Sequence, residues 1–495
     1  MTSLKQHPVK GQNIVVVGGG VGGLSAGIIL CLLGYSVTIV EKNPEAGGLM
    51  RSYLRAGFDC PVGVHYVGAL GDAEPLGRMF GLLGISGKDL FYRMGSDGII
   101  DRYVFDDFVF DLPVGLDAFA DSLRRACPAD RAAIDVIMKN LRQTAGKMTE
   151  ASFLLNSGDP FQNMDLLRPM GEYLDEVQAS GRLRAILAVP CQLIGVFLDD
   201  CPVIFHHMLL AGYLLSSWRL KEGGARMADV FTGRFVSLGG KLILNCAVEK
   251  IRVEGGKVSG VRLEPGADLP ADGVVAAIHP KVLLGLLDED VLRASLRERI
   301  ACLQETEGVI VLHAGVDAAS HPALDHNMYR LHCDDQGAMK DGVFYQMRAG
   351  GPSGRNLLTI ITRSLYSDWH SWENTRTGQR GALYKEKKMA MAFDLLKKAE
   401  TLLGPLTQAK ILDVFTPLTL RDYVNCPEGS CYGALRSTGQ LLKLASLNNL
   451  PVGGLCLAGQ NAVAPGVMGS ILGSFGAVRK LIGPKRFEQE LSRQL

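Results

Sequence analysis

The 495-residue chain has no excess of charge of either sign. Its 52 lysine and arginine residues nearly balance its 51 aspartate and glutamate residues, and no dense basic block occurs along it. Proteins that bind nucleic acid through its phosphates usually concentrate positive charge on one surface. The composition therefore gives no reason to expect a nucleic-acid partner. Hydrophobic residues make up 47% of the chain, which is ample for a large buried core.

Paired cysteine motifs are also missing. The 11 cysteines are scattered, and the one close pair, Cys426 and Cys431, has no second pair to complete a metal site. We therefore expect no bound metal. Scattered single thiols are typical of a reducing compartment, so we expect a cytoplasmic protein.

The N-terminal residues Met1–Gln12 are polar and lack the apolar run of a secretory signal. Residues 201–218 contain no charged side chain and approach the length of a membrane span. Pro202 and the consecutive residues His206 and His207 instead favour a buried helix beside an apolar pocket. A true membrane span, or insertion of the segment into the membrane surface, remains as an alternative. Neighbouring helical positions point about 100° apart, so at most one of these histidines should face the pocket.

A glycine-rich turn lies near the start of the chain. Residues Asn13–Val17 read as a fully buried strand, and residues 18–23 follow as Gly-Gly-Gly-Val-Gly-Gly. Apolar residues then recur at helical spacing up to Gly34, and a second strand, Ser36–Val40, ends at Glu41. This order of strand, glycines, helix, strand and acidic residue is typical of a dinucleotide-binding unit.

Each part of this unit has a physical role. Gly18 permits the tight turn, Gly20 lets the backbone approach a pyrophosphate, and Gly23 lets the helix pack closely on the sheet. Gly22 belongs to the same turn, whose helix N-terminus offers free N–H groups to phosphate. Glu41 is placed to accept hydrogen bonds from a ribose, and its charge disfavours a 2′-phosphate.

Further glycine loops occur at both ends of the chain. The loop 42–48 follows Glu41 and ends in a glycine pair. Residues 455–473 read as an apolar strand, then Gly459 and Gln460, then a loop through Pro465 and Gly466, and finally a helix from Val467.

With these segments the chain resembles the FAD-dependent amine oxidase-like superfamily, and within it the phytoene desaturase, carotenoid isomerase and retinol saturase group. The resemblance extends over nearly the whole chain and is weaker at about 116–200 and 301–410. Its matching segments are 17–23, 41–48, 57–68, 104–115, 223–251, 416–433 and 457–469. It implies a Rossmann-like (GR2-type) FAD-binding domain of α/β class, interleaved with an α+β substrate-binding domain.

The resemblance also implies a set of cofactor contacts for non-covalently bound FAD. Gly459 and Gln460 should lie by the pyrophosphate and ribityl chain, although many members have an acidic residue where this chain has Gln460. Val248, in a strand expected over 242–253, should meet the adenine. The remaining expected contacts are Lys42, Gly48, Leu49, Arg51, Gly466, Val467 and Met468. Many members have an arginine directly after the glycine pair, where this chain has Leu49, so whether Arg51 takes its place is open.

Two residues of the segment 61–68 are candidates for catalysis. In the family this segment runs close to the flavin, so His65 and Tyr66 could orient the substrate or move a proton. The alternative is that His65 is satisfied by backbone carbonyls beneath the flavin. No Ser/His/Asp or Cys/His arrangement stands out, and a flavin enzyme needs none.

The expected FAD-binding domain comprises residues 1–105, 223–300 and 411–495, and the substrate-binding domain comprises 106–222 and 301–410. The expected function is redox chemistry on carbon–carbon bonds of an apolar polyene or isoprenoid. Two alternatives remain: an amine or porphyrinogen oxidase, and a non-enzymatic binder of prenyl groups. We expect peripheral association with membranes. NAD(P)H is one candidate electron donor, and the sequence identifies no redox partner.

Overall fold

The computed structural model describes residues 11–155, 164–352 and 354–491. Most of the N-terminal segment Met1–Gln12 lies outside them. A five-stranded sheet contains the two strands expected around the glycine turn, in the order β10-β2-β1-β14-β20, and all of its pairings are parallel. Its strands are β1 (Asn13–Val17), β2 (Ser36–Val40), β10 (Lys241–Ile243), β14 (Gly273–Ala276) and β20 (Leu455–Leu457).

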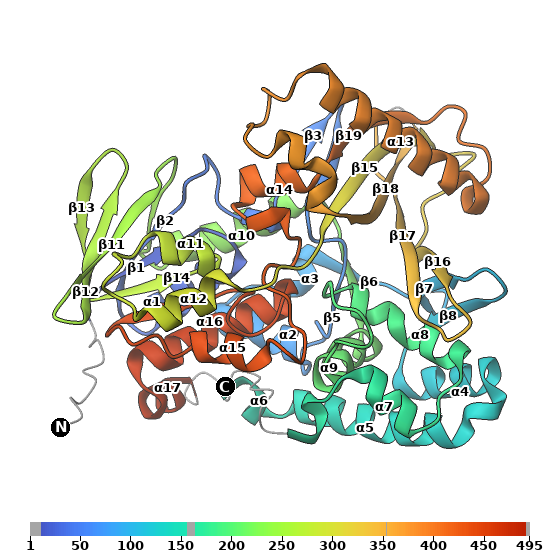
Figure 1. Cartoon of the computed structure of the whole chain (residues 1–495), viewed down its shortest axis with the longest axis horizontal. Coiled ribbons are helices and arrows are strands. Elements are labelled where there is room, and N and C mark those ends of the chain that lie inside the picture. Colours follow the sequence, from blue (N-terminus) through green and yellow to red (C-terminus); the bar gives the residue numbers. More distant parts are fainter. Residues whose placement is uncertain (1–10, 156–163, 353, 492–495) are drawn as a thin grey trace.

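Both faces of this sheet are covered (Figure 1). Ile14 and Val16 of β1 pack with the helices α1 (Val21–Leu32), α10 (Gly224–Ser237) and α16 (Gly466–Ile482). Val15 and Val17 pack with a small antiparallel sheet on the other face, formed by β11 (Val248–Glu254), β12 (Lys257–Leu263) and β13 (Ala267–Pro270). Burial on both faces explains why β1 is continuously apolar rather than alternating.

The strand expected over 242–253 is two strands in different sheets. β10 pairs with β2, whereas β11 pairs with β12. Between them Asn245 adopts a left-handed conformation (φ 52°), which turns the chain out of the first sheet. Val248 is consequently the first residue of β11.

A second, seven-stranded sheet has the order β19-β15-β18-β17-β16-β7-β8. Its strands are β7 (Ile99–Val104), β8 (Val109–Pro113), β15 (Gly308–Asp317), β16 (Asn327–Cys333), β17 (Met339–Arg348), β18 (Arg355–Ser364) and β19 (Lys410–Phe415). The expected boundaries at 105 and 411 cut this sheet, because β7 pairs with β16 and β19 pairs with β15. By strand pairing, β7 and β19 group with the segment 301–410.

Helices flank the second sheet on both sides (Figure 1). The long α13 (Gly381–Leu403) covers one side, where its Tyr384 packs against Trp369. The other side meets a helical layer that holds the largest core cluster. That layer contains α4 (Leu116–Ala126), α5 (Arg131–Thr149), α7 (Met170–Glu176), α8 (Gly181–Gln192) and α9 (Val203–Leu215).

Most of the uncharged segment 201–218 forms α9, which lies inside this layer and is buried along most of its length. The expected buried helix is therefore confirmed. Within the ranges given above, no helix combines the length and apolar character needed to cross a membrane. Because α9 is internal, it offers no surface to a bilayer either.

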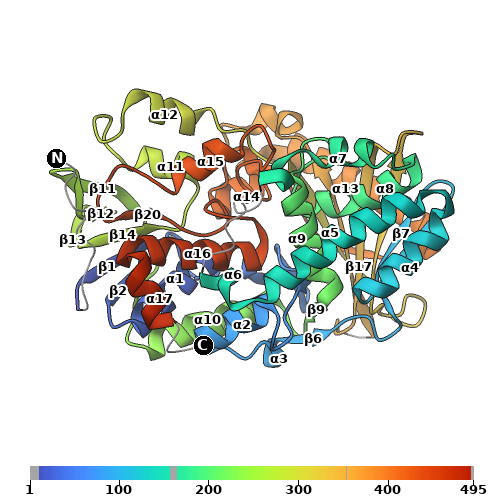
Figure 2. The same cartoon turned by 90° about the horizontal axis from the view of Figure 1, so that it is seen from below.

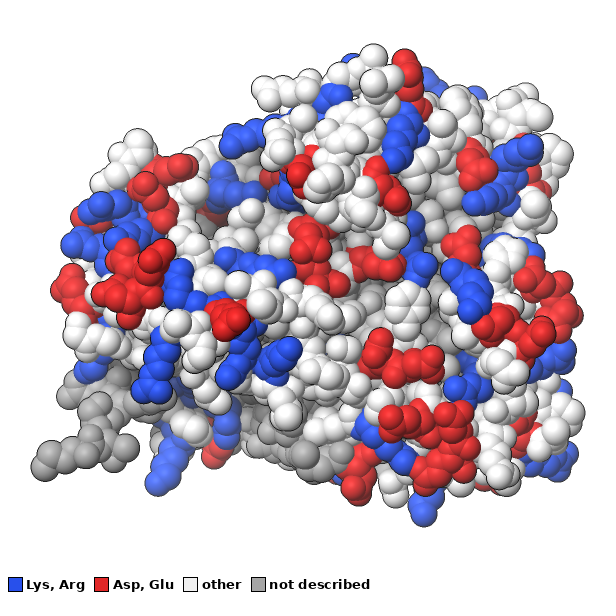
Figure 3. Space-filling view, in the orientation of Figure 1, with Lys and Arg blue, Asp and Glu red and all other residues white. Residues whose placement is uncertain are grey.

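Shorter elements connect the two large sheets. β3 (Ser52–Arg55) pairs with β4 (Phe58–Pro61), and β9 (Ser217–Leu220) pairs with β5 (Val67–Gly68) and β6 (Phe91–Arg93). The remaining helices are α2 (Pro75–Leu83), α3 (Gly87–Leu90), α6 (Ala151–Leu155), α11 (Pro280–Gly285), α12 (Ala294–Ala301), α14 (Pro417–Val424), α15 (Leu441–Leu447) and α17 (Pro484–Leu491). Lysine, arginine and acidic side chains are intermixed over the face shown in Figure 3.

Candidate functional site

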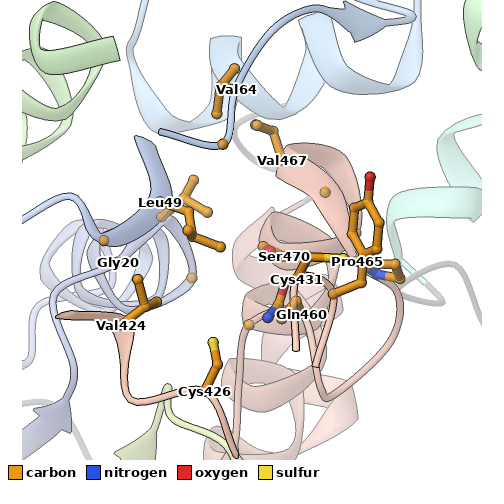
Figure 4. Close-up of a pocket in the computed structure, with 18 of the residues that line it drawn as sticks. Gly20, Leu49, Val64, Val424, Cys426, Cys431, Gln460, Pro465, Val467 and Ser470 are labelled. Carbon is orange, nitrogen blue, oxygen red and sulfur yellow. The ribbon is translucent and has the colours of Figure 1, made fainter. Parts of the chain in front are cut away.

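A cavity of about 570 Å³ runs between the two large sheets. At one end it is bounded by the glycine turn after β1 and by residues that follow β2, β14 and β20. At the other end it is bounded by α9 and by strands of the seven-stranded sheet. Gly20 and Leu49 lie on one side of the cavity, and Gln460 and Pro465 lie on the other (Figure 4).

The glycines of the turn have distinct surroundings. Gly18 has φ 100°, and a Cβ there would lie 2.8 Å from the carbonyl oxygen of Ala277. A Cβ on Gly20 would meet no atom within 4 Å, so this residue borders open space in the cavity. A Cβ on Gly23 would lie 1.9 Å from the Gly18 oxygen, so Gly23 serves close packing and does not line the cavity.

Gly22 has a role that the sequence did not indicate. A Cβ there would lie 2.5 Å from the Cα of Gly459. The Gly22 carbonyl also accepts a hydrogen bond of 2.7 Å from the hydroxyl of Ser474 on α16. Gly22 thus fixes α1 against the C-terminal segment, and Figure 2 shows α1 and α16 side by side.

This contact brings two helix N-termini to the same cavity. α1 follows Gly20 and α16 follows Pro465, and the first residues of both helices line the cavity. The first N–H groups of a helix have no partner within it and carry partial positive charge. This end of the cavity therefore suits an anionic group such as a pyrophosphate.

Glu41 lies at the end of β2 and is 7% exposed. One carboxylate oxygen accepts from the backbone N–H of Gly19 at 2.7 Å, and the other accepts from the backbone and side-chain amides of Asn43 at 2.9 and 2.8 Å. Glu41 therefore braces the glycine turn as well as bordering the cavity. A carboxylate has about four lone-pair directions, so capacity for a hydroxyl partner remains.

The other expected cofactor contacts divide into two groups. Arg51 does not line the cavity, because its guanidinium donates to the backbone oxygens of Gly48 and Glu45, both at 3.2 Å. It stabilises the loop that carries the glycine pair. The residues that do line the cavity are Lys42, Gly48, Leu49, Val248, Gly459, Gln460, Gly466, Val467 and Met468.

A buried arginine that sequence reasoning missed supports the 459–465 loop. Arg436 is 2% exposed and donates to the carbonyl oxygens of Val463 (2.8 Å), Ala434 (3.2 Å) and Gln460. Burial lowers its pKa to about 10. A guanidinium with these partners places positive charge behind the loop.

His65 and Tyr66 both line the cavity. Burial, followed by the charges of His313, Arg348 and Arg219, lowers the pKa of His65 to about 3, so its imidazole is neutral near pH 7. Its Nδ1 atom is buried and has no hydrogen-bond partner within the protein. The predicted alternative, a ring satisfied by backbone carbonyls, therefore does not hold for Nδ1.

Tyr66 belongs to a buried polar network behind the cavity wall. Its hydroxyl lies 3.0 Å from a carboxylate oxygen of Asp101 and 3.0 Å from the hydroxyl of Tyr329. The other Asp101 oxygen accepts from the side-chain amide of Asn327 at 2.8 Å. Burial raises the pKa of Asp101 to about 6, partly offset by these hydrogen bonds and by Arg219. Tyr329 also lines the cavity, whereas Asp101 and Asn327 do not.

The far end of the cavity is an apolar chamber. Its walls include Phe205, Leu209 and Tyr213 of α9, and Val311 and Ile361 of the seven-stranded sheet. The Tyr213 ring lies 4.7 Å from the Tyr66 ring.

His206 and His207 do not line this chamber. Their Nδ1 atoms lie 3.2 Å apart, and His206 Nε2 contacts the Leu187 carbonyl at 2.9 Å. Neither faces the pocket, which agrees with the expectation of at most one, and both lie in the helical layer. Within residues 11–155, 164–352 and 354–491, no cluster of three metal-ligating side chains occurs.

Comparison with known proteins agrees with this geometry. The model of a family described as flavin containing amine oxidoreductase matches residues 21–473. The chain therefore belongs to the flavin-containing amine oxidoreductases, as the sequence resemblance predicted. Its membership makes it a flavin-dependent oxidoreductase, in agreement with the sequence-based expectation.

Individual relatives share only a low sequence identity with this chain. The chain is 21% identical to all-trans-retinol 13,14-reductase of Danio rerio, covering 93% of this chain and 84% of that protein. It is 25% identical to 4,4'-diapolycopene oxygenase of Methylomonas sp, covering 86% and 88%. An oxidoreductase structure from Methanosarcina mazei aligns with a TM-score of 0.67 at 16% identity, covering 94% of this chain and 100% of that one.

The residues present fit a flavin dinucleotide. The space beside Gly20, which a Cβ would fill, is where a pyrophosphate needs backbone contact. A Cβ on Gly466 would likewise meet no atom within 4 Å, at the N-terminus of α16. The cavity thus offers a polar, backbone-lined end for an anionic group and continues into an apolar chamber.

Proposed function

We propose that this chain is an FAD-dependent oxidoreductase that acts on carbon–carbon bonds of an apolar polyene or isoprenoid by saturation, desaturation or isomerisation. The observation that carries the proposal is one continuous cavity, which joins a dinucleotide-type glycine turn to an apolar chamber. The names of the relatives, a retinol reductase and a diapolycopene oxygenase, agree with such a substrate.

In this proposal the five-stranded sheet is a Rossmann-like (GR2-type) FAD-binding unit that holds FAD without a covalent bond. Gly18, Gly20 and the N-termini of α1 and α16 contact the pyrophosphate, and Glu41 accepts from the adenosine ribose. Val248 borders the adenine. Gly466, Val467 and Met468 border the pyrimidine edge of the ring. When bound, the flavin supplies hydride transfer at its N5 atom.

The chamber walls hold an extended apolar substrate and exclude water from it. Burial, followed by the charge of Asp101, raises the pKa of the Tyr66 hydroxyl well above its usual value, so what favours Tyr66 over His65 as a proton donor is its hydrogen-bonded connection to a carboxyl group. The low pKa of His65 leaves it neutral at physiological pH, and so a weak acid. Tyr66 instead shares hydrogen bonds with Asp101 and Tyr329. When Asp101 is protonated it donates to Tyr66, which leaves a hydroxyl proton of the tyrosine pair free to point into the cavity.

The proposal is tested by anaerobic reoxidation of the reduced holoenzyme. A conjugated polyene or prenyl lipid should restore the oxidised flavin spectrum. Starting from oxidised enzyme, primary amines and porphyrinogens should leave that spectrum unchanged. Rapid bleaching by an amine would establish an amine oxidase in its place. Acid precipitation should leave all of the yellow chromophore in the supernatant, and flavin retained in the pellet would contradict non-covalent binding.

We further propose a cytoplasmic protein that associates peripherally with membranes, because an apolar polyene partitions into lipid. Liposome flotation should recover the protein, and high pH should release it. Failure to float with any lipid would contradict this part of the proposal. NAD(P)H is a candidate electron donor, tested by anaerobic reduction of the flavin with NADH or NADPH.

A further inference from the structure

One ion pair borders the apolar chamber. Glu307 lies just before β15, and Arg363 lies on the neighbouring strand β18. Arg363 Nε is 3.3 Å from Glu307 Oε2, and the guanidinium carbon lies 4.9 Å from the centre of the Phe197 ring. All three residues line the cavity.

These three residues are also open to solvent. The Arg363 and Glu307 side chains are 39% and 32% exposed, and Phe197 is 44% exposed. Side chains that border both the cavity and solvent lie at its mouth. The wall around this mouth is otherwise mainly apolar, with Ile194, Val309 and Ile361 as neighbours along the chain.

We propose that Glu307 and Arg363 bind the hydroxyl group at the end of an otherwise apolar polyene. This inference rests on the proposed function and names the polar end of its substrate. The ion pair joins Nε to Oε2. A hydroxyl can therefore donate to Oε1 and accept from the terminal N–H groups of the guanidinium, and the pair stays intact. Phe197 holds the guanidinium plane by cation–π contact.

The charge of the pair determines which end group fits. Glu307 lies beside Arg363 and neutralises its charge, so a carboxylate end group that approached the guanidinium would gain no net attraction and would lie close to a second carboxylate. A methyl end group would remove water from both charges and give no hydrogen bond in return. A hydroxyl both donates and accepts, and so satisfies both partners.

The test uses three conjugated polyenes of equal length that end in a hydroxymethyl, a carboxylate or a methyl group. Each is titrated anaerobically into oxidised holoenzyme, and binding is followed by the perturbation of the flavin absorption band. The wild-type protein should bind the alcohol at least about tenfold more tightly than the acid or the hydrocarbon, the range of a hydrogen bond to a charged group.

Two variants separate the two partners. Glu307→Gln removes the negative charge and should increase affinity for the acid by about tenfold, which largely removes the preference for the alcohol over the acid. Arg363→Met keeps the apolar stem but leaves Glu307 without its positive partner, so it should weaken binding of the alcohol and, more strongly, of the acid, and change binding of the hydrocarbon least. The control is Arg102→Met. Arg102 forms a comparably exposed pair with Asp111 in the same sheet, away from the cavity, and should change nothing.

Each remaining outcome contradicts one of the two proposals. If the wild-type protein binds all three polyenes within about threefold, or binds the acid most tightly, the hydroxyl subsite is wrong and the polyene function stands. If none of the three perturbs the flavin or reoxidises the reduced enzyme, the proposed function itself fails. Affinities that change in the control as much as in the two variants would also overturn the subsite.

Discussion

Replacing Asp101 by asparagine should make the folded protein more stable at neutral pH. Asp101 is 1% exposed, and burial raises its pKa from 3.8 to about 6. The folded state then binds a proton more tightly than the unfolded chain. The stability that proton binding at Asp101 contributes is therefore fully present below about pH 4 and is lost as the pH rises through about 6. An ionised Asp101 costs the folded state about 3 kcal/mol, at about 1.4 kcal/mol for each pH unit.

The asparagine variant preserves the local hydrogen bonds. Its oxygen can accept from Asn327, and its amide can donate to the Tyr66 hydroxyl, at the positions that the Asp101 oxygens occupy now. It carries no charge at any pH. The variant should therefore match the wild-type protein near pH 4 and exceed its free energy of unfolding by up to about 3 kcal/mol above pH 7.

The assay is urea denaturation of both holoenzymes at intervals from pH 4.5 to 8. Asp111→Asn is the control, because this carboxylate lies on the neighbouring strand in a half-exposed pair with Arg102. It should change stability by less than about 1 kcal/mol. A difference between Asp101→Asn and wild type that stays constant over the whole range would show that Asp101 does not titrate there.

Three further predictions concern the cofactor and the proton. Gly20→Ala should fold normally but lose flavin, because its Cβ enters open cavity space; flavin content equal to that of the wild-type protein would contradict this expectation. Gly22→Ala should instead cost roughly 1–3 kcal/mol of stability, because its Cβ overpacks against the C-terminal segment. Glu41→Ala should weaken flavin binding by roughly 1.5–3 kcal/mol in equilibrium dialysis. Tyr66→Phe should slow turnover more than His65→Ala does, and the reverse order would make His65 the proton donor.

The local parts of the dinucleotide unit could be predicted because their signals are local. β1, α1 and β2 follow one another within 28 residues, and each shows the period of its own structure. The break between β10 and β11 was missed. It depends on one left-handed residue, Asn245, inside a run of strand-forming residues. Asparagine tolerates that conformation, and this was the available signal.

The polar network could not be predicted from neighbouring residues. Asp101 and Asn327 are 226 positions apart, and the parallel pairing of β7 with β16 brings them together. The sequence does carry a weak sign, because Asp101 is a carboxylate inside the strand-like run 99–104 beside Ile100. A charged residue buried there requires partners. Nothing in the sequence alone identifies Tyr66 and Asn327 as those partners.

The segment 61–68 connects the two parts of the site, the proposed flavin site and the seven-stranded sheet. Its backbone is held by the seven-stranded sheet at two points: the Pro61 carbonyl contacts His313 Nε2 at 3.1 Å, and the His65 carbonyl accepts from Gln346 at 3.3 Å. The Tyr66 hydroxyl adds a third anchor at Asp101. Residues 62–68 line the same cavity as Gly466, Val467 and Met468, which are proposed to border the flavin ring. The sheet therefore determines where His65 and Tyr66 lie relative to a bound flavin, and substitutions at Gln346 or His313 would change the site's geometry without contacting the substrate.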